Sequence, residues 1–227
     1  MSDAAPTARP AVTLKLATSL DGRIATASGH SKWITGEVAR AEAHRLRAAH
    51  DAVLVGSGTV LADNPELTAR TDPPPARQPL RIIADSRARI PASARIFITL
   101  DKGPIAIATL ETSDLDHWPS AQGIQYWMVP KDPATGRLSI PELLNSAQRA
   151  GVRTLMIEGG GQLAASFVRA GLVDRIEWFR APILLGGDSL PAIASLGLES
   201  VTNAPTYERV SLNEAGPDLW ESYVRKA

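Results

Sequence analysis

A strand that turns through three glycines into a helix constrains the fold of this chain more than any other feature. Thr154 to Ile157 is a short apolar run, long enough for a buried strand but too short for a helix. Glu158 and Gly159 to Gly161 follow, and apolar residues at helical spacing continue from Leu163 to Val168. Such a turn gathers unpaired amide N–H groups at the positive end of a helix dipole, which favours a bound phosphate. A purely structural turn, with Glu158 capping or pairing locally, explains the same residues equally well.

The composition is that of an ordinary soluble globular protein. Of the 227 residues, 44% are hydrophobic and 21% are charged, and the formal net charge is +0. Balanced charge gives no steering toward nucleic acid or an anionic membrane, so we expect neither as a partner. No linker-like shift in composition divides the chain. We therefore predict a flexible tail over residues 1–10 and a single domain over residues 11–227.

Several kinds of site are excluded by the residues that the chain lacks. It has no cysteine, which rules out disulfides, thiolate zinc sites and cysteine nucleophiles. The four histidines, His30, His44, His50 and His117, show no metal-ligand spacing, and we interpret them as surface or local residues. The polar N-terminus has no apolar signal-peptide core, and no apolar run approaches the ~18 residues of a membrane helix. We therefore expect a cytoplasmic protein without a metal.

Alternating strands and helices predict the architecture. Helices are expected at residues 37–50 and 140–150, in addition to the one after the glycine turn. Strands are expected at residues 11–17, 52–55, 80–84, 95–99, 105–109, 124–129, 154–157 and 175–183, with an antiparallel pair at 207–212 and 219–224. This order predicts an α/β fold with a mixed, mostly parallel sheet and helices on both faces.

A lysine interrupts the first predicted strand. Val12 and Leu14 share one face of this strand, and Lys15 lies on the other. If that second face is exposed to solvent, Lys15 needs no further explanation. If both faces are covered, its ammonium group needs a partner, because an unpaired buried charge is very costly. Glu158, which also ends a strand, is the candidate partner.

Glycine also follows the second predicted strand, in Gly56-Ser57-Gly58-Thr59. This stretch fails as a dinucleotide fingerprint, because the third glycine is absent and Asp63-Asn64-Pro65 stops any long helix. It also lacks the Gly-Lys-Ser/Thr of a Walker A loop and the Gly-x-Ser-x-Gly of a nucleophile elbow. What remains is a strand end where a ligand can approach the backbone closely. Together with Lys15, Ser86 and Glu158, it marks strand ends that we expect to converge on one cleft.

Several motifs spread along the chain carry a resemblance to a known family. They are Leu14–Arg23, Ser31–Thr35, Gly56–Arg70, Asp85-Ser86 and Ile157–Gly161. In these motifs the sequence resembles the reductase domain of the bacterial riboflavin-biosynthesis deaminase/reductase. The resemblance runs from about Pro10 to Val224, which is nearly the whole chain.

The resemblance implies a dihydrofolate-reductase-like fold, a homodimer, and NADPH as the cofactor. It implies reduction of 5-amino-6-(5-phosphoribosylamino)uracil to the ribitylamino product, in which the ribose opens to an imine and hydride reaches C1′. Lys15 is the lysine that the family places beside the reacting centre, and we expect Lys15 and Glu158 to form the catalytic pair. Cofactor contacts are implied for Ala17, Trp33, Thr59, Asp63, Ser86, Gly160, Gly161, Gln162, Leu163, Ala164, Ala165 and Ser166, and substrate contacts for Ser31, Arg47, Leu67, Arg70 and Glu158.

Charged residues at these positions suit a phosphorylated substrate and a phosphorylated cofactor. Arg47 and Arg70 can offer a phosphate paired donors that a lysine could not match, although solvated surface arginines are the alternative. Arg87 and Arg89 beside Ser86 could hold the 2′-phosphate that separates NADPH from NADH, and surface arginines explain them equally well.

Lys15 would then serve the chemistry directly. As a cation next to Glu158, it could stabilise the opening sugar oxygen and relay a proton to the amine.

One departure from the family leaves alternatives open. The bacterial protein usually carries a second, zinc-dependent deaminase domain with cysteine ligands, and this chain has no cysteine. A separate deaminase is therefore expected elsewhere, or the substrate differs. A reductase of the same fold could act on the non-deaminated diaminopyrimidinone, or on a pterin or folate. The other alternative is a non-catalytic, nucleotide-binding paralogue, although Lys15, Glu158, Arg47 and Arg70 argue against it.

Overall fold

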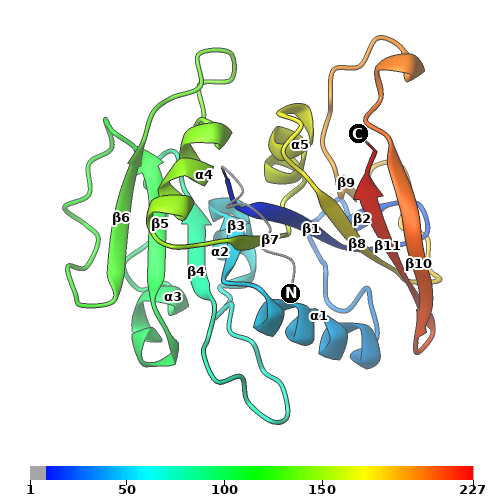
Figure 1. Cartoon of the computed structure of the whole chain (residues 1–227), viewed down its shortest axis with the longest axis horizontal. Helices are drawn as coiled ribbons and strands as arrows, with labels where there is room; N and C mark the ends of the chain where they lie inside the picture. Colours follow the sequence, from blue (N-terminus) through cyan, green and yellow to red (C-terminus); the bar gives the residue numbers. More distant parts are fainter. Residues whose placement is uncertain (1–8, 227) are drawn as a thin grey trace, which may run out of the picture.

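One nine-stranded sheet with helices on both faces organises the protein (Figure 1). The computed structural model describes residues 9–226, so most of the predicted tail lies outside the described residues. The exceptions are Arg9 and Pro10; the Arg9 guanidinium donates to both carboxylate oxygens of Asp174, at 2.6 and 2.8 Å. The strands lie in the order β10 (Tyr207–Ala215), β11 (Asp218–Arg225), β8 (Arg175–Arg180), β1 (Ala11–Thr18), β7 (Thr154–Glu158), β3 (Ala52–Gly56), β4 (Leu80–Ala84), β5 (Ile105–Leu110) and β6 (Ile124–Val129).

The sheet is mostly parallel. Every neighbouring pair from β8 across to β6 runs parallel, whereas β11 is antiparallel to both β8 and β10. A small second sheet pairs β2 (Arg23–Ala25) with β9 (Leu190–Pro191). The α/β class and the closing antiparallel pair predicted from the sequence are confirmed.

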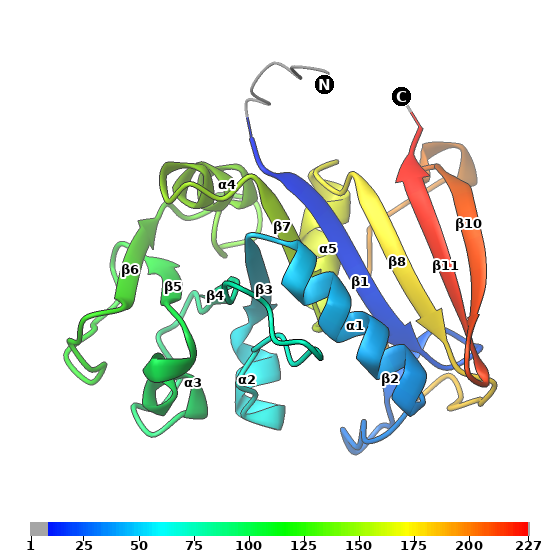
Figure 2. The same cartoon turned by 60° about the horizontal axis from the view of Figure 1, so that its bottom comes forward.

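Helices cover the two faces of the sheet separately. On one face, α4 (Ile140–Arg149) and α5 (Gly161–Arg169) pack on alternate residues of β1, β7 and β3. On the other face lie α1 (Glu37–Ala49), α2 (Ser57–Asp63) and the single turn of α3 (Arg95–Ile98). Figure 2 shows α1 running along this second face of β1. Two short 3-10 turns, η1 (Leu100–Lys102) and η2 (Val201–Asn203), complete the regular structure.

The first strand is covered on both sides. Val12 and Leu14 are buried in the core beneath α4 and α5, as the alternation predicted. Lys15 points to the other face, where α1 packs, so its ammonium group does not stand on an open sheet surface. The interpretation of Lys15 as a surface lysine is therefore wrong.

Two predicted strands differ from the structure. Residues 95–99 form the helical turn α3, because neighbouring Ile96 and Phe97 are both buried while Ile98 is exposed, a pattern that suits a helix and not an alternating strand. The strand predicted over 175–183 ends at Arg180. Pro182 lacks the N–H that a longer strand would need for its ladder.

Candidate active site

The carboxyl ends of the central strands meet at one edge of the sheet. β1, β7, β3 and β4 are parallel, and their registers align Lys15 with Glu158 and Gly56 with Ala84. Ligands on open α/β sheets bind at this edge. The structure therefore brings together the strand ends that the sequence marked.

The centre of this edge is an ion pair between Glu158 and Arg47. Arg47 lies in the last turn of α1, and Glu158 ends β7 with 8% of its surface exposed. The arginine Nε lies 2.5 Å from Oε1, and its terminal nitrogen donates to Oε2 at 2.8 Å. Burial alone would raise the pKa of Glu158, but the charge and hydrogen bonds of Arg47 outweigh it and hold the pKa below its ordinary value. Glu158 is thus a carboxylate over the neutral pH range.

Lys15 lies beside this pair without joining it. Within residues 9–226, no carboxylate oxygen comes within 4.0 Å of the Lys15 ammonium nitrogen, so the predicted direct partner, Glu158, is bound by Arg47 instead. The ammonium nitrogen lies 5.6 Å from the ring centroid of Phe179 on β8. Burial lowers the pKa of Lys15, the charge of Glu158 opposes that shift, and Arg47 adds to it. A lysine tuned downward in this way is suited to proton transfer.

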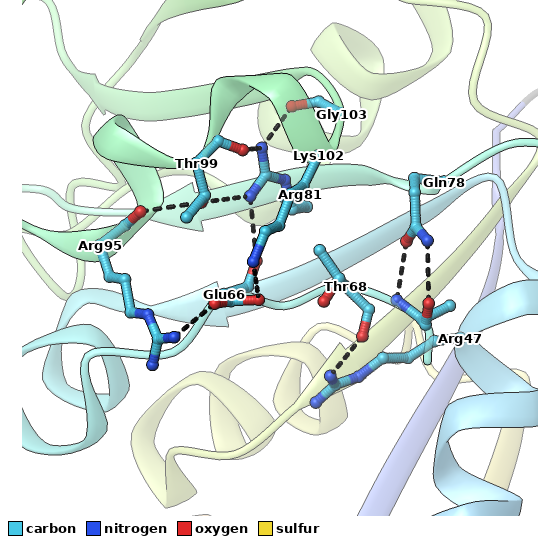
Figure 3. Close-up of polar contacts among 10 residues, drawn as sticks. Arg47, Glu66, Thr68, Gln78, Arg81, Arg95, Thr99, Lys102 and Gly103 are labelled. Atoms are coloured by element: carbon cyan, nitrogen blue, oxygen red, sulfur yellow. Dashed lines mark hydrogen bonds and ion pairs between the residues drawn. The ribbon is translucent and has the colours of Figure 1, made fainter. Parts of the chain in front are cut away.

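The loop after α2 brings further cationic and backbone groups to the same place. The third nitrogen of the Arg47 fork donates to the Thr68 carbonyl at 3.0 Å (Figure 3). Arg47 thus uses three of its five N–H donors on Glu158 and this loop, which leaves one N–H on each terminal nitrogen for a further partner. The Arg70 backbone N–H donates to His44 Nδ1 at 3.2 Å. Burial and the charges of Arg47 and Arg70 lower the pKa of His44 to about 4, which keeps its ring neutral and able to accept.

Arg70 is the cation that the site leaves available. Among residues 9–226, its exposed guanidinium makes no hydrogen bond or ion pair. Burial and the nearby Arg47 lower its pKa, although not enough to discharge an arginine at neutral pH. Leu67, three residues earlier, is buried and has a left-handed backbone with φ of 59°. Its side chain belongs to the core, so a substrate contact there would involve backbone atoms.

The glycine turn between β7 and α5 has the backbone geometry that a bound phosphate needs. Gly159 and Gly160 have φ of 64° and 80°, values that favour glycine. A methyl group on Gly159 would come within 3.2 Å of the Thr59 hydroxyl, so α2 lies close to the turn. The first amides of α5, from Gly161 to Leu163, have no intrahelical acceptor. These amides and the Thr59 hydroxyl fit the pyrophosphate of a nicotinamide dinucleotide.

The rest of α5 divides between the core and the surface. The side chains of Ala164 and Ala165 are buried, and the Ala164 amide already donates to the Gly160 carbonyl. The Ser166 hydroxyl donates to the Gln162 carbonyl at 2.9 Å. The amides of Gln162 and Leu163 could make the ligand contacts predicted for these residues. The contacts predicted for Ala164 and Ala165 would require the helix to move or unwind.

Trp33 and Ser31 belong to the loop that follows β2. Trp33 is 71% exposed, and the Arg40 guanidinium lies 4.5 Å from its ring centroid. The ring borders a surface hollow of about 430 Å³ together with residues 34–37, 181–183, Pro217 and Asp218. Ala17 and the hollow lie at the same edge of the sheet, because the Ala181 N–H donates to the Thr18 carbonyl.

Beyond β4, a charged turn lies against α2. Arg89 donates to the Ser57 hydroxyl at 2.8 Å, at the first residue of α2. Its own amide donates at 2.7 Å to Asp85, which is fully buried. Ser86 is partly buried and Arg87 is exposed. Asp63 ends α2 on the surface.

Sequence reasoning missed the residues that hold the substrate-side loop. Arg81, on β4, is fully buried and donates to the Glu66 carbonyl, while Gln78 bonds both the amide and the carbonyl of Ala69 (Figure 3). The sequence did mark Arg81 as unusual, because an arginine inside an apolar strand is as unexpected as Lys15 in β1. Among the described residues, no group of histidine and acidic side chains could hold a metal ion, and no helix is long and apolar enough to cross a membrane.

The family model described as the RibD C-terminal domain matches residues 10–220 of this chain. The chain belongs to that family. RibD of Bacillus amyloliquefaciens, a riboflavin biosynthesis protein, is 39% identical over 216 residues; the match covers 94% of this chain and 57% of that protein. The chain thus spans little more than half of this relative. Family membership confirms the resemblance found in the motifs.

A second relative matches over its whole length. The 2,5-diamino-6-ribosylamino-4(3H)-pyrimidinone 5′-phosphate reductase of Methanothermobacter thermautotrophicus is 35% identical, with 96% of this chain and 99% of that protein covered. Among solved structures, RibD of Acinetobacter baumannii has a TM-score of 0.80 and 27% identity, with 97% of this chain and 59% of that chain covered. Dihydrofolate reductase from Enterococcus faecalis has a TM-score of 0.50 and 14% identity, with 96% and 97% covered, which shows the shared fold alone.

Proposed function

We propose that this protein is an NADPH-dependent reductase of riboflavin biosynthesis. Its substrate would be 5-amino-6-(5-phosphoribosylamino)uracil, and its product the ribitylamino compound. The observation that carries the proposal is the arrangement of Lys15 beside the Arg47–Glu158 ion pair, at the sheet edge that also holds the glycine turn. Membership of the RibD C-terminal domain family supports it.

NADPH would bind along the glycine turn. The amides at the start of α5 and the Thr59 hydroxyl would hold the pyrophosphate, and the Ser86 turn with Arg87 and Arg89 would hold the 2′-phosphate. When bound, the cofactor would supply the hydride for C1′ of the substrate.

Lys15, supported by the charge of Glu158, would carry out the proton transfer to the substrate. As the ribose opens, its C1′–O4′ bond breaks, a C1′=N bond forms, and the amine proton moves to O4′. Hydride addition at C1′ then leaves the nitrogen in need of one proton. The Lys15 ammonium would stabilise the departing oxygen and supply that proton, while the charge of Glu158 keeps the buried lysine protonated.

Arg70 would bind the substrate phosphate. Its guanidinium is free of protein partners within residues 9–226 and can present paired donors. The Arg47–Glu158 pair would hold the ribityl hydroxyls, with Ser31 from the loop after β2. Leu67 would contact the substrate through its backbone.

A second candidate substrate is the non-deaminated diaminopyrimidinone. It is favoured by the 35% identity to the archaeal reductase that is named for that compound and that is matched over 99% of its length. The two compounds differ at one ring substituent, and we assign the residues named above to the ribose and its phosphate, so these residues would not discriminate between the two compounds. We further propose that the protein acts in the cytoplasm as a homodimer and that a separate protein carries out the deamination.

Parallel assays with both pyrimidines test the function. NADPH oxidation should accompany formation of a product two mass units heavier than one of the substrates. The deaminated compound should react with the higher kcat/KM, and the non-deaminated compound should not lose its amino group. Oxidation of NADPH only with dihydrofolate or a dihydropterin, or with no substrate tried, would exclude the proposed function. Light scattering of the purified protein tests the dimer.

A further inference from the structure

We propose that Arg81 is a positioning residue for substrate binding, which fixes the loop from Asn64 to Arg70 through the backbone carbonyl of Glu66. The proposal rests on the proposed function, because this loop carries Leu67 and Arg70, two residues that we assign to the substrate.

Arg81 occupies a place where an apolar side chain would be expected. It lies in the middle of β4 and is fully buried, next to Ile82 and Ile83, which are also buried. No carboxylate oxygen within residues 9–226 comes within 4.0 Å of its guanidinium. A buried charge without a carboxylate is costly unless its donors are hydrogen-bonded, and both terminal nitrogens of Arg81 are bonded. Burial lowers the pKa of Arg81 to about 10, which still leaves it charged at neutral pH.

The guanidinium of Arg81 bonds three backbone carbonyls from two segments outside β4. One terminal nitrogen donates to the Glu66 carbonyl at 3.1 Å and to the Thr99 hydroxyl at 3.0 Å. The other donates to the Thr99 carbonyl at 2.8 Å and to the Gly103 carbonyl. Figure 3 shows this fan of bonds, which joins β4, the loop after α2 and the chain around η1. One side chain thereby sets where the loop lies relative to the sheet.

The loop is held on both sides of a leucine in an unfavourable conformation. Leu67 has φ of 59°, which a leucine rarely adopts without outside support. The carbonyl before it, of Glu66, accepts from Arg81, and the carbonyl after it, of Thr68, accepts from Arg47. Arg47 also binds Glu158. Arg81 is therefore one end of a bonded chain that sets Leu67 and Arg70 against the reacting centre.

Three other side chains that contact the same loop can be compared with Arg81: Gln78, Lys102 and Arg95. The Gln78 side chain accepts from the Ala69 amide and donates to the Ala69 carbonyl, both at 2.8 Å. By contrast, the Lys102 and Arg95 side chains reach the Glu66 carboxylate, at 3.0 and 2.5 Å, from half-exposed positions, and the Arg95 amide donates to the Asn64 side chain at 2.7 Å. Exposed ion pairs hold geometry weakly. Lys102→Met is therefore the control for loss of a positive charge near Glu66.

Steady-state kinetics of Arg81→Met, Arg81→Lys and Lys102→Met test the proposal. A displaced loop should raise the KM for the pyrimidine at least about tenfold in Arg81→Met, since about 1.4 kcal/mol of binding corresponds to each decade. The KM for NADPH should stay within about twofold, because Arg81 bonds Glu66, Thr99 and Gly103 and not the glycine turn, α2 or the Ser86 turn that we assign to the cofactor. Arg81→Lys, which keeps the charge and some of the bonds, should recover part of the loss, and Lys102→Met should match the wild type. Equal changes in both KM values, or an unchanged KM for the pyrimidine, would overturn the assignment.

Hydrogen exchange in the free protein separates this proposal from the proposed function. The amides of residues 66–70 should exchange faster in Arg81→Met and in Gln78→Met, while those of α4 should be unchanged. If Arg81→Met does not fold, Thr99→Val, which removes one Arg81 acceptor, should give the same pattern in weaker form. Unchanged exchange at 66–70 would refute the positioning role, whatever the kinetics. Absence of reduction of either pyrimidine by the wild type would refute the function alone.

Discussion

Glu158 and Lys15 lie at matched positions on neighbouring strands, yet the glutamate bonds an arginine from α1 and leaves the lysine beside an aromatic ring. Lys15 and Glu158 therefore interact through their charges and not through a hydrogen bond. A substitution that removes the charge of Glu158 should change the protonation of Lys15 without moving it.

Loss of either member of this pair should reduce turnover sharply. In Glu158→Gln and Lys15→Met, kcat should fall by about 10² to 10⁴, the usual cost of losing a positioned proton-transfer group. NADPH binding, measured by fluorescence titration, should stay within a few-fold. The double variant should be little worse than either single one, because groups that act as a unit are not additive. Multiplicative loss in the double variant would show independent action.

The pH profile of the activity that remains in Glu158→Gln shows in which direction Glu158 shifts the pKa of Lys15. The charge of Glu158 raises the pKa of Lys15 against the effect of burial. Removing that charge in Glu158→Gln should lower the pKa of Lys15, so the alkaline limb of kcat/KM should move to lower pH. If the alkaline limb of kcat/KM does not move, a group other than Lys15 determines it.

Arg70 should be sensitive to a change that keeps its charge. Arg70→Lys loses the paired donors of the guanidinium, and the KM for the phosphorylated substrate should rise about tenfold. Arg45→Lys, an exposed arginine on α1, is the matched control and should leave the KM unchanged. Removing the phosphate from the substrate should erase the difference between wild type and Arg70→Lys.

At the scale of elements, the start of α5 leaves no room for a residue larger than glycine at position 161. A methyl group on Gly161 would fall on the Pro191 carbonyl oxygen, well inside contact distance, and within 3.3 Å of the Ala194 amide. Gly161→Ala should therefore lower the Tm by several degrees, as overpacking typically costs about 1–3 kcal/mol. Gly58→Ala in α2 has open space around the new methyl group and should leave the Tm equal or slightly higher. Thermal unfolding of both variants gives the comparison.

The turn after β4 should decide between the two nicotinamide cofactors. Arg87 is exposed beside Ser86, and Arg89 is anchored at the first residue of α2. Arg87→Ala and Arg89→Ala should each reduce the ratio of kcat/KM for NADPH to that for NADH, because a 2′-phosphate loses a cation. An unchanged ratio would remove these arginines from cofactor selection.

Most elements could be predicted from the sequence, including the short apolar runs at 52–55, 80–84 and 105–109, but the run at 95–99 could not. The alternation in residues 11–17 and the strand–glycine–helix unit at 154–168 correspond to real elements, because each pattern is local and long enough. The run at 95–99 was wrong, since four residues of α3 carry no period that separates a turn of helix from a strand.

The site was predictable as far as strand ends, and no further. Lys15 and Glu158 stood out because charged residues in apolar strands need a reason, and parallel strands bring their ends together. The ion pair between Arg47 and Glu158 depends on how α1 crosses the sheet, and no local sequence pattern predicts that crossing. Arg81 carried the same signal as Lys15, but its partners are backbone carbonyls from distant loops, which have no sequence signature.

At the scale of the whole molecule, Asp174 ties the start of the chain to the sheet. Its carboxylate accepts from the Arg9 guanidinium and from the Val12 amide at 2.8 Å. Burial would raise its pKa, but the bonds from Arg9 and Val12 prevail and the pKa lies below 3.8. A depressed pKa in the folded state stabilises above the unfolded value, and the stabilisation is lost as the pH falls. The Tm gap between wild type and Asp174→Asn should thus be widest near neutrality and close as the pH falls through the lowered folded-state pKa.

The position of β1 at the middle of the sheet governs the order in which the protein can be built. Residues 11–18 are made well before their two neighbours, β7 and β8, which lie at residues 154–158 and 175–180. Until those residues are made, the apolar face of β1 and the lysine on its other face have no strand to pair with. β3, β4, β5 and β6 can pair in sequence as they emerge, whereas the edge that carries the candidate site closes only once β7 and β8 have been made. A nascent chain stalled before residue 154 would therefore hold half a sheet and no active site.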